Sequence, residues 1–160
     1  MSGQAALSRR ELVAYARESI ERGSKSFAVA SRLFDRKTRE RVWLLYAWCR
    51  KCDDMADGQD HGGRMECVAD PLETLAAIRS LTERAMAGEN TGEPAFDALG
   101  VVAVESGLTM AMADDVINGF ALDAADWHPR TEDDLYRYCF HVAGAVGVMM
   151  AVVMGVKPDD

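Results

Sequence analysis

Hydrophobic residues recur every three or four positions along nearly the whole chain, a spacing typical of amphipathic α-helices. No convincing pair of alternating strands interrupts this pattern, and no Asn-Gly hairpin flanked by alternation does so. A first helix is expected after Ser8 and should end at Gly23, and one side of it carries Leu12, Tyr15, Ala16 and Ile20. The pattern predicts an all-α fold.

Capping residues and helix breakers divide the remaining chain into further helices. Asp35 can cap a long helix that Gly58 ends, and Thr131 can cap the last one. The Asp70-Pro71-Leu72-Glu73 segment combines a capping aspartate, proline at the first helical position and glutamate three residues after the cap. The helices expected after the first run over about residues 27–34, 35–58, 70–88, 94–106, 109–124 and 131–154.

Length and composition fit one folded domain. The chain has 160 residues, of which 49% are hydrophobic and 28% charged, as is ordinary for a globular protein. The formal net charge of −8 argues against nucleic acid as a partner, because no general basic field attracts phosphates. For the same reason, a polyanionic substrate would need metal ions to enter this protein.

The cysteines indicate a reducing compartment. The segment 1–10 has no apolar core, so no signal peptide is expected, and the four cysteines are expected to be reduced thiols in the cytoplasm. Cys49 and Cys52 form a C-x-x-C pair, and His61 and Cys67 follow, so a zinc site stays open. The first two cysteines lie in the middle of a helix near its apolar side, which favours buried thiols.

The longest uncharged run covers residues 142–156. It is shorter than the roughly 20 residues that a membrane span requires, and it contains Gly144, Gly147 and Gly155. We therefore expect a buried core helix and no transmembrane segment, while peripheral contact with a membrane remains open.

A polar stripe runs along the long helix from Tyr46 to Asp57. At roughly 100° per residue, Tyr46, Arg50, Asp53 and Asp57 fall within about 60° of one another. The opposite side of the same helix is apolar and carries Leu44, Leu45, Trp48, Cys52, Met55 and Ala56. Such a stripe is either a solvated surface or the wall of a site for a metal ion and an anion.

Spacing alone leaves both interpretations of the stripe open. Carboxylates at i and i+4, here Asp53 and Asp57, project from neighbouring turns and can share a hard cation such as Mg²⁺. If the face is instead solvated, Arg50 pairs with Asp54. A calcium loop beginning at Asp53 is excluded, because non-ligand residues occupy its third position and its closing position.

Two further segments have patterns that suggest binding. Ser24-Lys25-Ser26-Phe27 places hydroxyls and an ammonium at the start of a helix, which is an anion seat or simply a cap. The segment 138–147 is Tyr-Cys-Phe-His-Val-Ala-Gly-Ala-Val-Gly, and it indicates tight helix packing or a smooth channel wall for a hydrocarbon. One apolar face of this segment is expected to contain Tyr138, Val142, Ala145 and Met149.

Taken together, these motifs resemble the squalene/phytoene synthase family, with bacterial phytoene synthases the most similar. The three segments 24–27, 46–57 and 138–147 occur in the order seen in that family, and segment 115–123 also matches. The resemblance implies an isoprenoid-synthase-type helical bundle. Residues 1–160 would be the N-terminal part of one such domain, about half the family's length, without its second aspartate-rich helix.

The resemblance implies a prenyltransferase of carotenoid biosynthesis. Such an enzyme condenses two geranylgeranyl diphosphates head-to-head to phytoene through a cyclopropyl diphosphate. A squalene or dehydrosqualene synthase that uses farnesyl diphosphate is the alternative within the family. An inactive fragment or a non-catalytic helical binding module would also fit the sequence, and the 160-residue chain alone is expected to be inactive.

The resemblance also assigns roles to residues. Asp53 and Asp57 would bind Mg²⁺ or Mn²⁺, and Arg50 and Ser24 would contact diphosphate oxygens. Phe27 and Tyr46 would line the cavity where a carbocation forms, with Tyr46 among the catalytic residues. The channel for the prenyl tail would be lined by Tyr138, Val142, Val146 and Gly147.

Overall fold

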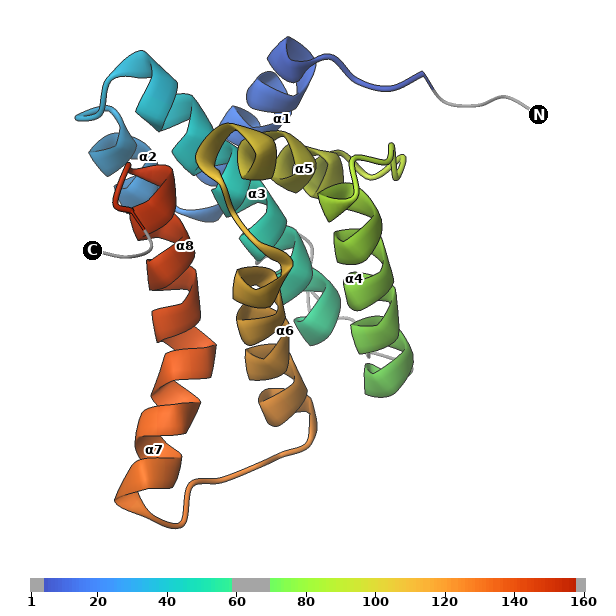
Figure 1. The fold of residues 1–160 in the computed structure, drawn as a ribbon, viewed down its shortest axis with the longest axis vertical. Coiled ribbons are helices and arrows are strands. Elements are labelled where there is room, and N and C mark those ends of the chain that lie inside the picture. Colours follow the sequence, from blue (N-terminus) through green and yellow to red (C-terminus); the bar gives the residue numbers. More distant parts are fainter. Residues whose placement is uncertain (1–4, 59–69, 158–160) are drawn as a thin grey trace.

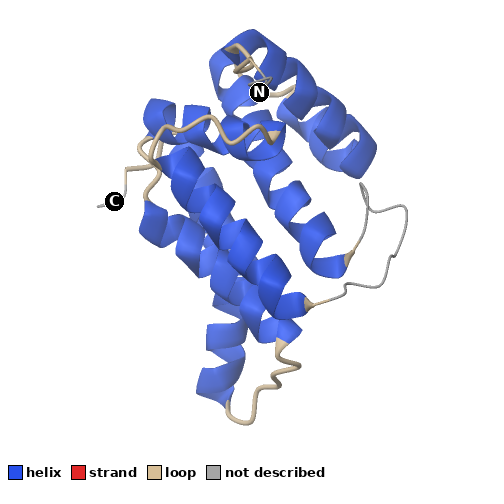
Figure 2. Cartoon of the chain, turned by 90° about the vertical axis from the view of Figure 1, so that its right-hand side faces the viewer, coloured by secondary structure: helices blue, strands red, loops and turns tan. Residues whose placement is uncertain are grey.

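The computed structural model describes residues 5–58 and 70–157, and every regular element in these two ranges is helical (Figures 1 and 2). The prediction of an all-α fold is therefore confirmed. In chain order the elements are α1 (Arg9–Gly23), α2 (Lys25–Ser31), α3 (Arg36–Asp57), α4 (Pro71–Met86), α5 (Pro94–Ser106), α6 (Met110–Ala124), α7 (Glu132–Cys139), the π-helical turn η1 (Phe140–Gly144) and α8 (Ala145–Val153).

The helix boundaries follow from capping side chains. The side chains of Asp35, Asp70 and Thr131 each accept a backbone N–H at the start of α3, α4 and α7. Gly58 ends α3 in the left-handed conformation, with φ of 65°. The predicted boundaries are thus confirmed for α1 and for α3 to α6. Helix α2 differs, because it begins at Lys25 and ends at Ser31, where the chain turns instead of continuing as a helix to residue 34.

Helix α3 is the centre of the bundle, since it contacts α1, α5, α4, α8, α2 and α6 (Figure 1). Its apolar side is buried as predicted: Leu44, Leu45 and Trp48 are fully enclosed. Each such side chain contributes about 1.5–3 kcal/mol to stability by burial. The Trp48 indole N–H donates to Thr82 Oγ1 of α4 at 3.3 Å, which satisfies the one polar atom of this buried ring.

The thiols of α3 belong to this core. Cys52 is fully buried, Cys49 is partly buried, and burial raises the pKa of Cys49 to about 12. Cys52 lies in the hydrophobic core and Cys49 packs against it, which favours the interpretation as buried thiols. His61 and Cys67, the other two candidate zinc ligands, lie outside the described residues.

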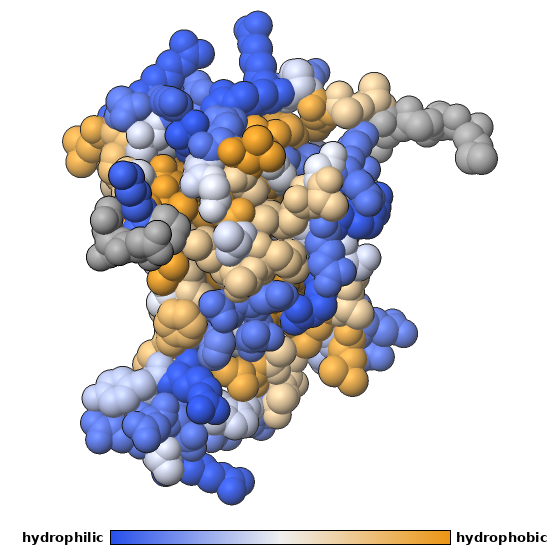
Figure 3. All heavy atoms as spheres, viewed as in Figure 1, coloured by the Kyte–Doolittle hydropathy of each residue, from blue (hydrophilic) through white to orange (hydrophobic). Residues whose placement is uncertain are grey.

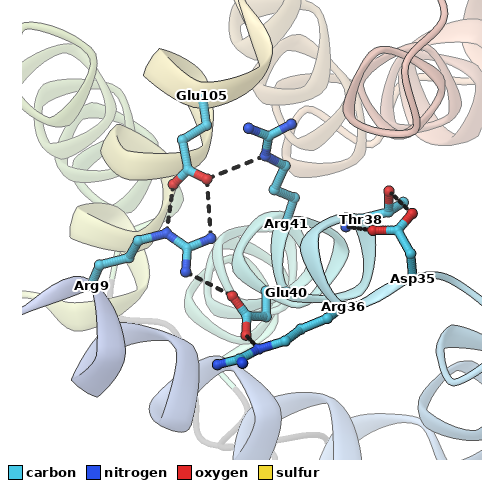
Figure 4. Close-up of polar contacts among 7 residues, drawn as sticks. All are labelled: Arg9, Asp35, Arg36, Thr38, Glu40, Arg41 and Glu105. Carbon is cyan, nitrogen blue, oxygen red and sulfur yellow. Dashed lines mark hydrogen bonds and ion pairs between the residues drawn. The ribbon is translucent and has the colours of Figure 1, made fainter.

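Ion pairs join α1, α3 and α5 at the N-terminal half of α3 (Figure 4). Arg9 donates from Nε to Glu105 Oε2 at 2.8 Å and from Nη1 to Glu40 Oε2 at 2.7 Å. Arg41 also contacts Glu105, with 3.2 Å between Nε and Oε1, and Arg36 contacts Glu40. The hydrogen bond from Arg9 holds the pKa of Glu105 below its usual value. This network fixes three helices at the end of α3 remote from the predicted site.

The last helix is interrupted in the middle by the π-turn η1, which the hydrophobic pattern did not predict. A π-turn holds one more residue than an α-turn, so it rotates the side chains before it relative to those after it. The expected common face is accordingly split, because Ala145 and Met149 are buried whereas Val142 is 40% exposed. The expectation of a fully buried core helix is wrong for this outer side, and Figure 3 shows hydrophobic side chains reaching the surface there.

The segment Glu132–Val153 has 22 residues and is, by length and composition alone, able to cross a membrane. In the structure it packs along α6 and also contacts α3. Its first turn carries three acidic side chains. The expectation that the chain has no transmembrane segment is compatible with this packing.

Candidate functional site

The polar stripe occupies the C-terminal half of α3, where Arg50 is anchored by two carboxylates. Arg50 Nη2 lies 3.0 Å from Asp54 Oδ1, and Arg50 Nη1 lies 3.5 Å from Asp53 Oδ2. Asp54 is buried, whereas the Asp53 side chain is 44% exposed and Asp57 is exposed. The Arg50–Asp54 pair expected for a solvated face is present. This ion pair still leaves the carboxylates of Asp53 and Asp57 facing outward.

The electrostatics of Asp53 suit a cation. Partial burial raises the pKa of the Asp53 carboxyl, and the negative charge of Asp57 raises it further, while Arg50 opposes both effects. A divalent cation between the two carboxylates would relieve their repulsion. Among the described residues, no group of three or more His, Cys, Asp or Glu is placed to hold a metal ion. The stripe alone therefore offers two protein ligands, a number that Mg²⁺ accepts.

An aromatic wall stands next to the stripe. The rings of Phe27 and Tyr46 lie 6.4 Å apart between centroids, at an angle of 41°, and Phe27 is 56% exposed. The Tyr46 hydroxyl sits against Gly23, where an added Cβ would lie 2.2 Å from the oxygen. Burial raises the pKa of Tyr46, so the phenol is neutral near pH 7. The structure thus brings two of the predicted site residues together.

Ser24 connects this wall to the start of α2. Its Oγ accepts the backbone N–H of Phe27 at 3.3 Å and lies 3.3 Å from Ser26 Oγ. The hydroxyl therefore serves as the cap of α2, which is one of the two roles predicted for the 24–27 segment. Its contact with a diphosphate stays a prediction.

Tyr138 is held by a partner that the sequence motifs did not single out. Its hydroxyl donates to Asp123 Oδ1 at 2.7 Å, and Trp127 stacks on its ring with centroids 6.0 Å apart. This hydrogen bond raises the pKa of Tyr138. Burial and, to a smaller extent, the charges of nearby carboxylates that include Asp123 raise the pKa of Asp53. Asp123 lies in the segment 115–123, whose match to the family was the only signal that pointed to it.

The other predicted channel residues are not enclosed in the described part of the chain. Val146 is partly buried and packs against the hydrophobic core, but Val142 and Gly147 are exposed. A Cβ added to Gly147 would meet no atom within 4 Å. Within residues 5–58 and 70–157, no channel encloses the exposed positions Val142 and Gly147.

Replacing Asp123 by Asn is expected to lower the pKa of Tyr138 towards that of a free tyrosine, because the amide keeps an acceptor oxygen but loses the negative charge. Ultraviolet titration of tyrosinate in the 160-residue chain measures this shift, with Tyr138→Phe identifying the Tyr138 signal. Asp133→Asn, an exposed carboxylate on α7, is the matched control. An unchanged Tyr138 titration in Asp123→Asn would contradict the hydrogen bond.

Comparison with known proteins identifies the family of this chain. The sequence model of the squalene/phytoene synthase family matches residues 20–160. The chain belongs to this family. The resemblance seen in the three ordered motifs is therefore confirmed, and the match extends over all three.

Relatives of this squalene/phytoene synthase chain are similar over nearly its whole length. A phytoene synthase of Pseudescherichia vulneris is 46% identical over 96% of this chain, which corresponds to 50% of that relative. A 15-cis-phytoene synthase of Pantoea ananas is 45% identical over 92% of this chain and 48% of its own length. The chain spans about half the length of the curated relatives it matches.

Solved structures of the same family confirm the isoprenoid-synthase-type bundle. A squalene synthase from Alicyclobacillus acidocaldarius superposes with a TM-score of 0.80 at 28% identity, over 94% of this chain and 54% of that one. A dehydrosqualene synthase with a bound ligand superposes with a TM-score of 0.75, over 91% and 48% respectively. The bundle described here therefore corresponds to about half of each of these family structures.

Proposed function

We propose that this chain forms the N-terminal half of the catalytic site of a phytoene synthase. The reaction would be the head-to-head condensation of two geranylgeranyl diphosphates to phytoene through a cyclopropyl diphosphate. The observation on which the proposal depends is the pair of outward-facing carboxylates, Asp53 and Asp57, beside an anchored Arg50 and the aromatic wall of Phe27 and Tyr46.

Asp53 and Asp57 would hold Mg²⁺ or Mn²⁺. The donor set fits, because both groups are carboxylates one helical turn apart, and burial together with their repulsion raises the pKa of Asp53. A bound metal ion would neutralise the negative charge that develops on the diphosphate as the bond between the diphosphate and carbon breaks. Mg²⁺ takes one or two carboxylates and completes its shell with water and phosphate oxygens.

The remaining residues would bind the substrate and shield the cation. Arg50 is held in place by Asp54, so its guanidinium can donate to diphosphate oxygens with little loss of side-chain freedom. Ser24 would add a hydroxyl. The ring faces of Phe27 and Tyr46 would stabilise positive charge on the prenyl carbon without offering a charged nucleophile, since Tyr46 stays neutral.

The prenyl tail would lie along Tyr138, Val142, Val146 and Gly147. In this chain Asp123 and Trp127 fix the Tyr138 ring at one end of that path. The path is open to solvent on one side, and a dry channel would need further residues to cover it. We therefore propose that the 160-residue chain alone has no synthase activity.

A squalene-type function is the alternative. The two solved structures that superpose are a squalene synthase and a dehydrosqualene synthase, each 28% identical to this chain. The phytoene synthases from Pseudescherichia vulneris and Pantoea ananas are 46% and 45% identical, which favours the phytoene reaction. A helical binding module without catalysis would show no metal-dependent affinity for a prenyl diphosphate.

Product identification tests the proposal. A full-length synthase that contains this sequence is incubated with Mg²⁺ and either geranylgeranyl or farnesyl diphosphate, and the hydrocarbons are separated by chromatography and identified by mass. We expect phytoene from the first substrate. Squalene or dehydrosqualene as the main product would favour the squalene-type function. If neither substrate gave a hydrocarbon product, the proposed synthase function would be contradicted. Phytoene made by the purified 160-residue chain would contradict its proposed inactivity.

A further inference from the structure

A second polar site lies at the opposite half of α3, in a cavity of about 280 Å³ between α1, α2 and α3. Trp43 and Asp53 are ten residues apart on α3, so this cavity is about 15 Å along the helix from the carboxylate pair. None of the residues given a role in the proposed reaction lines it. Its lining residues are Arg17, Ile20, Glu21, Ala28, Arg32, Arg39 and Trp43.

The cavity is positive in a protein whose formal net charge is −8. Three arginines line it against one carboxylate, Glu21, which is 3.0 Å from Arg17 and offsets that charge. The Nε atom of Arg39 is buried and has no hydrogen-bond partner among the described residues. A buried, unsatisfied cationic donor costs free energy unless an anion completes it.

The arginines are held in position by Trp43. The guanidinium carbons of Arg17 and Arg39 lie 5.8 Å and 5.6 Å from the centroid of the indole ring, which is cation–π distance. The ring itself is fixed, because its N–H donates to the Oγ of the buried Ser31 at 2.8 Å. Two of the three cationic groups are therefore ordered before any ligand arrives, which lowers the entropy cost of binding.

We propose that this cavity binds a phosphate group. Guanidinium groups match phosphate geometry with paired N–H donors. A cavity of about 280 Å³ lies below the range of about 300–1,000 Å³ typical of pockets for drug-sized ligands, so it suits a small anion. The phosphate could belong to a soluble phosphate or diphosphate or to a phospholipid headgroup. Val29 and Leu33, neighbours of the lining residues Ala28 and Arg32, are 62% and 89% exposed and would enter a bilayer beside a bound headgroup.

Binding to the 160-residue chain tests the site in two arms, both in EDTA so that no metal-dependent binding at Asp53 contributes. One arm measures inorganic phosphate and diphosphate by isothermal titration calorimetry. The other measures flotation with vesicles of phosphatidylcholine and phosphatidylglycerol. Binding in the first arm alone identifies a soluble ligand, and binding in the second alone identifies a lipid headgroup. Binding in both arms shows that the site accepts either, and each of these results supports the proposal.

The variants locate the bound phosphate. Arg39→Gln and Arg32→Gln should each weaken binding about tenfold or more, the loss expected for one charge-assisted hydrogen bond, and added salt should weaken it further. Arg10→Gln, an exposed arginine of α1 that does not line the cavity, should bind like the unmodified chain. Arg32 is at the surface, so its replacement should preserve the fold even if that of Arg39 does not. Absence of binding in both arms would overturn the proposal, and so would equal affinity of the unmodified chain and Arg32→Gln.

Discussion

Replacing Asp53 by Asn in a full-length synthase containing this sequence is expected to lower kcat/KM by on the order of 10³-fold. The amide keeps the size of the side chain but loses the negative charge, so the outward-facing pair would retain one ionised carboxylate. A single carboxylate one turn away, Asp57, holds a divalent cation more weakly and places it less accurately. The loss should appear in both kcat and kcat/KM, because the charge on the leaving group grows only as the bond breaks.

A binding measurement separates the loss of metal from a loss of fold. Calorimetric titration of the 160-residue chain with a non-hydrolysable prenyl diphosphate should show affinity that depends on Mg²⁺, and Asp53→Asn should abolish that dependence. Asp133→Asn, on the exposed first turn of α7, supplies a control with the same chemical change away from the stripe. Near-normal turnover of Asp53→Asn would contradict its role as a metal ligand.

The stripe could be predicted because it depends on one helix alone. The helical period fixes which of Tyr46, Arg50, Asp53 and Asp57 share a face, and the capping residues fix where that helix begins and ends. The same period placed Trp48 in the core. Such local rules depend only on residues within a few helical turns of one another, so the sequence alone contains the information they need.

Features that depend on packing between helices could not be predicted. Asp123 reaches Tyr138 only because α6 packs beside the last helix, and no spacing within either segment contains that information. The same is true of Arg17, whose position over the Trp43 ring follows from how α1 and α3 pack. The motif match to the family included the 115–123 segment, yet it gave Asp123 no role.

The π-turn coincides with a close contact between α6 and the last helix. Gly119 lies so close to η1 that an added Cβ would be 2.3 Å from the His141 carbonyl oxygen and 3.3 Å from Val142 Cα. The His141 ring is also fixed, since its Nδ1 lies 3.1 Å from the Asp115 carbonyl oxygen. A helix that passes this close over a glycine presents its backbone to α6, and the rotation of Val142 away from the buried face accompanies that contact.

Gly119→Ala is therefore expected to destabilise the chain by about 2 kcal/mol or more, as overpacking in a tight interface does. Alanine is a better helix former than glycine by about 1 kcal/mol, so helix propensity alone would increase the free energy of unfolding. A decrease would show that the contact between the helices dominates. The clash is with backbone atoms, which cannot move aside as a flexible side chain would. Urea unfolding followed by circular dichroism measures the change, and displacement of η1 should also disturb the Tyr138–Asp123 hydrogen bond.

Gly147→Ala is the matched control for the stability measurement. It lies on the same last helix, where an added Cβ meets no atom within 4 Å, so only the gain in helix propensity remains. We expect this variant to be as stable as the unmodified chain or more stable by up to about 1 kcal/mol. If Gly119→Ala gained stability to the same extent, the approach of α6 to the π-turn would not be a tight backbone contact.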